Sequence, residues 1–187
     1  MSEASSTLSF AQAVQASDVL FDRESLQRAV AEVGARVDVA LDGERALFLT
    51  IMHGGLIFAG QLALSMRTDV EFDYVHATRY RGDTRGHELQ WLRKPEAEMQ
   101  GRTVLLVDDI LDEGRTLKAV REACLAMGAR RVLIVTLCTK LHDRRVPDLE
   151  ADFNGVEVPD RYVFGFGMDY HEQGRNLPEI RALRSVS

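Results

Sequence analysis

The chain has 187 residues, of which 45% are hydrophobic and 28% charged, so it can form one sizeable core and has the composition of a globular domain. Its 23 basic and 29 acidic residues give a net charge of −6, which disfavours sequence-independent nucleic-acid binding but not the binding of phosphorylated small molecules. The N-terminal segment MSEASSTLSFAQAV lacks a basic head and a long apolar run, and no apolar stretch nears the roughly 18 residues of a membrane span. We therefore expect a cytoplasmic protein that binds neither nucleic acid nor membrane.

The first predicted element is a helix over residues 23–37, whose apolar residues have helical spacing and whose stop we place at Gly34. A continuous apolar run over 46–52 predicts a strand buried on both faces, and the paired glycines after it open a second helical pattern. Aromatic and β-branched residues over 72–80 predict another strand. The polar, glycine-interrupted segment 81–88 predicts an exposed, mobile loop.

The second half of the chain predicts strands over 102–110 and 130–139, joined by an amphipathic helix that ends at Gly128. A short strand over 162–166 is followed by polar residues and glycines. Cys124 and Cys138 lie in apolar contexts without a CxxC spacing, so we expect small buried hydrophobic residues. The order strand–helix–strand–strand–helix–strand, without a repeat or linker, predicts a single α/β domain over 1–187, with a mainly parallel central sheet flanked by helices.

The segment VLLVDDILDEGRTL, residues 104–117, carries the most chemical information. Its apolar strand ends in Asp108 and Asp109, and Thr116 opens the following helix. The turn between them holds Asp112, Glu113 and Gly114. Ligands of open α/β sheets bind beyond the carboxyl ends of the strands, and free amides at a helix N-terminus suit a phosphate. Paired carboxylates suit sugar hydroxyls or a hydrated Mg²⁺, so the segment predicts a site for a phosphorylated sugar with a metal. The alternative is that these acids only cap a helix or solvate a loop.

VDDILDEGRTL resembles the 5-phosphoribosyl-1-pyrophosphate (PRPP) motif of type I phosphoribosyltransferases, and other segments resemble the hypoxanthine-guanine branch. MHGGLIFAGQL resembles its pyrophosphate loop and TRYRGDTRG its catalytic lid. VTLCTKLHDRR and VPDRYVFGFGMDYHEQGRNLPEI resemble its purine-binding segments. The resemblance, from about Leu47 to Leu183, implies a small purine-binding hood made of the N-terminal segment and residues about 140–187. It also implies transfer of 5-phosphoribosyl from PRPP to N9 of hypoxanthine or guanine, giving IMP or GMP and pyrophosphate.

The resemblance implies roles around PRPP. Asp108 and Asp109 would hold the ribose hydroxyls, directly or through Mg²⁺. His53 and Gly54 would contact pyrophosphate, often across a non-proline cis peptide in this family, and Arg175 would also bind pyrophosphate. The 5-phosphate would bind to backbone amides and the Thr116 hydroxyl of one loop. That loop consists of Asp112, Glu113, Gly114, Arg115 and Thr116.

The resemblance implies a second group of roles around the purine. Asp112 would lie near N7 as the catalytic acid/base, and Lys140 would donate to the 6-oxo group. Tyr162 would stack on the base, and the Val163 backbone would meet the exocyclic position. Asp169 would ligate a second Mg²⁺. In the lid, only Tyr80 matches the family pattern; the family also implies dimers or tetramers.

The chain departs from the family pattern at Glu113, where Thr is common, at Asp108, where Glu is common, and at Arg79, where Ser is usual. An acid at position 113 is unfavourable beside a phosphate unless its side chain turns outward.

For several of these residues, a purely structural role stays open as the alternative. Tyr162 could be a core residue, Lys140 a solvated charge, His53 a loop histidine, and Arg175 with Asp169 a surface ion pair. Three other functions stay open as well. They are a xanthine-preferring relative, a regulator of the same fold that senses PRPP or nucleotides and binds nucleic acid, and a phosphatase-like α/β protein.

Overall fold

A six-stranded sheet forms the centre of the protein in the computed structural model, which describes residues 8–79 and 89–184. The strand order is β4-β3-β2-β5-β6-β7, and every neighbouring pair is parallel except β3 with β4. The strands are β2 (Ala46–Met52), β3 (Val70–Arg79), β4 (Leu89–Arg93), β5 (Thr103–Leu111), β6 (Arg131–Leu141) and β7 (Phe153–Pro159). This is the mainly parallel sheet that the sequence predicted.

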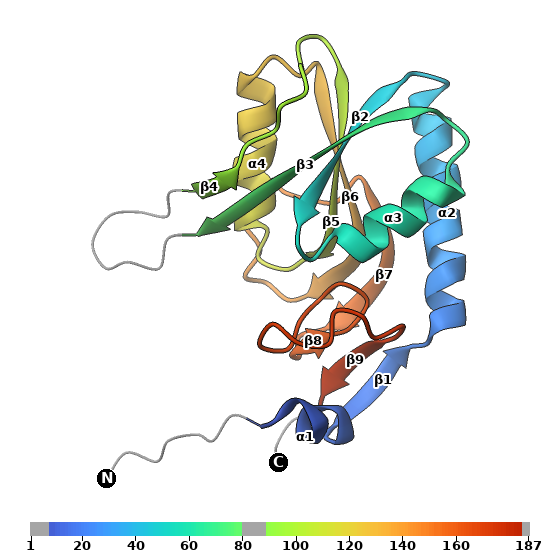
Figure 1. The fold of residues 1–187 in the computed structure, drawn as a ribbon, viewed down its shortest axis with the longest axis vertical. Coiled ribbons are helices and arrows are strands. Elements are labelled where there is room, and N and C mark those ends of the chain that lie inside the picture. Colours follow the sequence, from blue (N-terminus) through green and yellow to red (C-terminus); the bar gives the residue numbers. More distant parts are fainter. Residues whose placement is uncertain (1–7, 80–88, 185–187) are drawn as a thin grey trace.

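Helices cover both faces of this sheet, with α2 (Arg23–Leu41) and α3 (Leu56–Ser65) on one side and α4 (Arg115–Ala126) on the other (Figure 1). Successive strand residues serve opposite faces: Phe48 packs in the cluster with α2 and α3, and Leu47 in the cluster with α4. Cys124 and Cys138 are buried and free, as expected. In the described part of the chain, no helix is long and apolar enough to cross a membrane.

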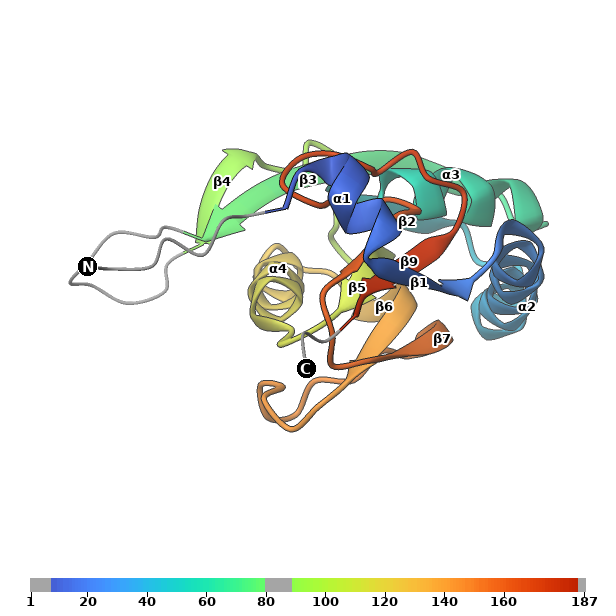
Figure 2. The ribbon, with the colours of Figure 1, turned by 90° about the horizontal axis from the view of Figure 1, so that it is seen from below.

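A smaller antiparallel sheet joins the N-terminal segment to the C-terminal tail (Figures 1 and 2). Its order is β1-β9-β8, with β1 (Ser17–Phe21), β9 (Ile180–Leu183) and β8 (Val163–Phe164), and α1 (Phe10–Gln15) lies beside it. Arg161 donates to Asp18 at 2.7 Å and fixes the start of β8 to β1. The N-terminal segment therefore shares one small sheet with the last part of the range expected to form a hood, whereas Phe153–Pro159 of that range belongs to the large sheet as β7.

Gly34 does not end the first long helix, contrary to the prediction. The helix α2 continues to Leu41 and ends at Asp42, which has a positive φ of 47°. A Cβ at Gly34 would lie 2.3 Å from the Ser65 Oγ at the end of α3. The glycine thus allows two helices to approach closely, which the pattern of a single helix does not reveal.

The sequence also missed several peripheral elements, namely α1, β1, β4, β7 and β9. The tail strand predicted over 162–166 shrinks to the two residues of β8, because Gly165 and Phe166 both have positive φ. The lid expected over 80–88, with Tyr80, lies outside the described residues.

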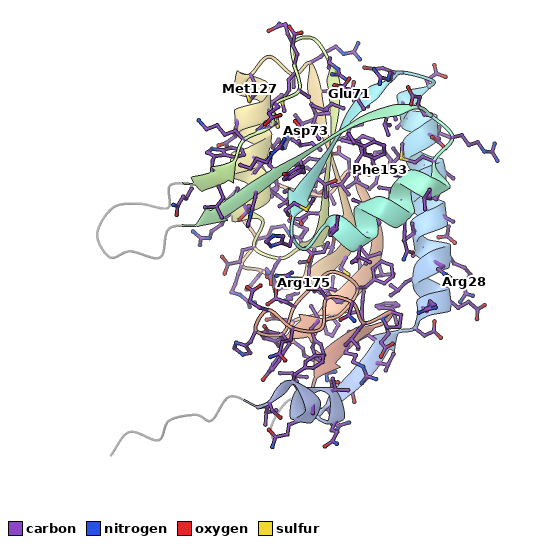
Figure 3. All side chains as sticks on the ribbon, viewed as in Figure 1. Arg28, Glu71, Asp73, Met127, Phe153 and Arg175 are labelled. Carbon is purple, nitrogen blue, oxygen red and sulfur yellow. The ribbon has the colours of Figure 1, made fainter. Side chains whose placement is uncertain are left out.

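Asp73 of β3 fastens the segment that follows β4 (Figure 3). Its carboxylate accepts hydrogen bonds from the backbone N–H of Glu96 at 2.7 Å, from that of Ala97 at 2.9 Å, and from the Arg93 guanidinium at 2.8 Å. Burial acts to raise the pKa of Asp73, but these hydrogen bonds outweigh it and leave the pKa below its ordinary value. The ionised carboxylate therefore stabilises the fold.

Candidate active site

The turn between β5 and α4 forms the predicted phosphate cradle. Gly114 begins α4 with φ 80°, and a Cβ there would lie 2.4 Å from Leu149 Cδ2. The first amides of a helix have no acceptor within that helix, so those of α4 are available to an anion. They face a cavity of about 300 Å³. Its walls are Asp108, Asp109, Ile110, Asp112, Glu113, Gly114, Arg115, Thr116, Leu117 and Arg144.

Glu113, the main departure from the family pattern, forms an ion pair with its neighbour on the same turn. Its Oε2 lies 2.9 Å from Arg115 Nε, and its backbone oxygen accepts a hydrogen bond from the Val146 N–H. The pair offsets the carboxylate charge close to the cradle. The acid at position 113 is therefore accommodated without an unpaired negative charge beside the expected phosphate.

Asp108 and Asp109 lie within the last four residues of β5, and Asp109 lies against Gly54 of the predicted pyrophosphate loop. Asp109 is 8% exposed, and its N–H donates to Asp108 Oδ1 at 3.0 Å. Burial and the adjacent Asp109 carboxylate raise the pKa of Asp108 well above its usual range. A Cβ at Gly54 would lie 2.1 Å from Asp109 Oδ2, so only glycine lets this backbone approach the acid pair. The non-proline cis peptide joins Met52 to His53, one bond before the position suggested by the family.

Asp112 is held by two side chains from the end of β6 and the residue that follows it. Lys140 Nζ donates to Asp112 Oδ2 at 2.6 Å, and His142 Nε2 lies 2.7 Å from Asp112 Oδ1. Partial burial acts to raise the pKa of Asp112, but the hydrogen bonds from Lys140 and His142 outweigh it and hold the pKa below its ordinary value. Lys140 is thus a paired group with a side chain only 12% exposed, rather than a solvated charge.

A second cavity, of about 220 Å³, adjoins the first and contains the predicted purine residues. Its walls are Asp109, Ile110, Asp112, Lys140, Tyr162, Val163, Met168 and Asp169. Tyr162 is 44% exposed, so it is not a core residue and presents its ring to this cavity. Asp109, Ile110 and Asp112 line both cavities. Asp112 therefore lies on the boundary between the predicted phosphate and base sites.

Arg175 and Asp169 form an ion pair with each other, which is the structural alternative that the sequence left open for these two residues. Arg175 Nη2 lies 2.7 Å from Asp169 Oδ1, and Arg175 Nη1 donates to the Gly167 carbonyl at 2.8 Å. Gly167 in turn lies against Gly54, because a Cβ there would be 2.2 Å from the Gly54 carbonyl oxygen. The tail and the predicted pyrophosphate loop therefore meet at these glycines, and the pair lies beside the second cavity.

Within residues 8–79 and 89–184, no group of three or more His, Cys, Asp and Glu side chains could hold a metal ion without other ligands. Asp108 and Asp109 nevertheless fit a Mg²⁺ that arrives with a phosphorylated substrate, since such ions are held by one or two carboxylates together with phosphate oxygens and water. Asp169 would first have to release Arg175.

Sequence reasoning missed His142 and Arg144, although both lie in the segment that resembles a purine-binding element. His142 contacts Asp112, and Arg144 lines the phosphate cavity while its two Nη atoms each donate to Asp160 at 2.7 Å. The resemblance indicated only Lys140 in this segment. His142 and Arg144 lie in the turn after β6, where the alternation of a strand no longer predicts which way a side chain points.

Residues 17–173 match the family described as "Phosphoribosyl transferase domain", and the chain belongs to that family. The hypoxanthine-guanine phosphoribosyltransferase of Bacillus subtilis (strain 168) is 34% identical over 167 residues, which are 89% of this chain and 92% of that protein. The enzyme of the same name from Streptococcus agalactiae serotype V is 32% identical over the same shares. A crystal structure of a hypoxanthine phosphoribosyltransferase from Staphylococcus aureus matches with a TM-score of 0.83 at 32% identity, covering 89% of this chain and 91% of that one. Within its family, the chain is therefore a member of the hypoxanthine-guanine phosphoribosyltransferases.

Proposed function

We propose that this protein transfers the 5-phosphoribosyl group of PRPP to N9 of hypoxanthine or guanine, producing IMP or GMP and pyrophosphate. The observation that carries the proposal is the pair of adjoining cavities with Asp112 in their common wall. One cavity offers helix amides to a phosphate, and the other offers a lysine and an exposed aromatic ring to a base. A nucleoside monophosphate needs both kinds of site, separated by the length of a ribose.

The proposed roles around the purine follow from the side chains of the second cavity. Lys140 has three donor hydrogens, so it can keep Asp112 and also donate to the purine 6-oxo group. Adenine presents a donor at that position and would leave the ammonium without an acceptor. Tyr162 stacks on the base, the Val163 backbone meets its exocyclic position, and Asp112 accepts the proton released at N7.

The proposed roles around PRPP follow from the first cavity and the loop beside it. The amides of residues 112–116 and the Thr116 hydroxyl bind the 5-phosphate, and Asp108 with Asp109 holds the ribose hydroxyls. The backbone at His53 and Gly54, together with Arg175, receives the pyrophosphate. Mg²⁺ held by Asp108 and Asp109, and by Asp169 once Arg175 releases it, would supply electrostatic stabilisation of the departing oxygens.

We also propose that the N-terminal segment and residues about 140–187, which include the small β1-β9-β8 sheet, form the purine hood of a single domain, with the lid at Tyr80 excluding water during transfer. The expected setting is the cytoplasm, and the expected assembly is a dimer or tetramer without nucleic-acid or membrane partners.

A base panel with PRPP and Mg²⁺, followed by pyrophosphate release, tests the proposal. We expect release with hypoxanthine and guanine and little with adenine. A preference for xanthine would favour the xanthine-using alternative. Release with none of these bases, while PRPP still binds, would favour the regulator alternative, and we would then abandon the transferase proposal.

A further inference from the structure

His142 directly follows β6, and both of its ring nitrogens have a partner. Its side chain is 2% exposed. Nε2 faces Asp112 Oδ1 at 2.7 Å, and Nδ1 accepts a hydrogen bond from the Arg144 N–H at 3.0 Å. Because Nδ1 accepts, it carries no proton, and the ring proton must lie on Nε2. The ring is therefore a neutral donor to Asp112.

The two oxygens of Asp112 have different partners. Oδ2 accepts from Lys140, which lines the base cavity, whereas Oδ1 faces His142, which is absent from the lining of either cavity. A purine 6-oxo group would share the Lys140 ammonium with Asp112 and draw the flexible lysine side chain toward the base. The bond to His142 does not compete with the base, so it persists while the site is filled.

We propose that His142 is a positioning residue for Asp112. It holds Oδ1 in place, so that Asp112 faces the boundary of the two cavities even when Lys140 turns toward the purine. The inference rests on the proposed function, because the consequence is a faster transfer step. The same ring also accepts a hydrogen bond from the Arg144 N–H, and Arg144 lines the first cavity. A competing explanation is therefore that His142 only fixes the shape of the turn that contains Arg144.

Two substitutions separate the two bonds of the ring. In His142→Gln the amide nitrogen reaches the place of Nε2 and can donate to Asp112, while the acceptor for Arg144 is lost. In His142→Asn the amide oxygen reaches the place of Nδ1 and can accept from Arg144, while the donor to Asp112 is lost. We expect His142→Asn to lower kcat by about tenfold or more, the size typical of a lost hydrogen bond to a charged group, with a nearly unchanged KM for PRPP. We expect His142→Gln to retain most of kcat.

Equal losses of kcat in both variants, a larger loss in His142→Gln, or no loss in either would overturn the proposal. A rise in the KM for PRPP as the main effect would indicate the turn-shaping role instead. The tautomer provides a measurement that needs no variant: ¹⁵N NMR of the wild-type imidazole should show the proton on Nε2, and a proton on Nδ1 would refute the geometry. Absence of transfer with any purine in wild type would defeat the proposed function, whereas wild-type turnover with the wrong tautomer would defeat only the role of His142.

Discussion

Replacing Asp112 by Asn tests the proton role at the centre of the mechanism. The carboxylate accepts one hydrogen bond from Lys140 and one from His142, whereas the Asn oxygen can serve only one of them and the amide NH₂ then faces the other donor. One lost bond to a charged group costs about 1.5–3 kcal/mol. Because the Asp112 side chain is 41% exposed, water recovers part of this, and we expect a loss of about 1 kcal/mol in the free energy of unfolding. That corresponds to a fall in Tm of about 2–4 °C.

The kinetic effect should be far larger than the effect on stability. Loss of general acid–base help typically lowers turnover by about 10²–10⁴-fold, equivalent to about 3–5 kcal/mol in the barrier. A stability loss of about 1 kcal/mol leaves nearly all of the protein folded, so it cannot produce such a change. The assay is steady-state pyrophosphate release at saturating hypoxanthine, PRPP and Mg²⁺, with PRPP affinity measured separately and expected to stay within about threefold. The matched control for the loss of one negative charge is Asp143→Asn, because Asp143 is an exposed acid that follows His142 in the chain. Near-full turnover in Asp112→Asn would leave that residue as a structural acceptor only.

Three further substitutions test Lys140, the unusual acid Glu113, and Asp73, which holds the segment after β4. Lys140→Ala should lower the efficiency with hypoxanthine and guanine by about tenfold or more and leave PRPP affinity nearly unchanged; equal losses in both would show that Lys140 does not face the base. Glu113→Thr should tighten PRPP binding in calorimetry, since it removes an acid, frees Arg115 and adds a hydroxyl donor, and weaker binding would reveal a positive role for the acid. Asp73→Asn should lower the free energy of unfolding at pH 7 by about 1–3 kcal/mol. Because the folded pKa of Asp73 is lowered, this difference is full above the ordinary value of 3.8 and shrinks as the pH falls below it; a gap in Tm that is constant with pH would contradict the prediction.

The central elements could be predicted from sequence because each carries a strong local signal. The strands β2, β5 and β6 are apolar runs buried on both faces, and α4 is an amphipathic helix between them. The peripheral strands β1, β7 and β9 have mixed polarity because one side of each is partly exposed. β7 pairs with the strand before it, β6, but the pairing of β1 with β9 joins distant parts of the chain. Such pairing leaves no trace in a window of a few residues.

The candidate site divides in the same way. The acids and the glycine of the turn after β5 were predictable, because a strand end and a helix start fix where their backbone lies. The bond from His142 to Asp112 joins residues 30 positions apart through a side chain, and no spacing rule predicts it. The pairing of Glu113 with Arg115 depends on rotamers of the turn, so the sequence raised the conflict at position 113 without resolving it.

The order of strands in the small sheet makes the other two strands depend on the middle one. The middle strand, β9, follows β1 and β8 in the chain, yet both of those strands pair with it. Without Ile180–Leu183, neither β1 nor β8 would keep a partner within this sheet. A change that displaced this short strand would therefore separate the N-terminal segment from the residues that carry Tyr162 and Val163.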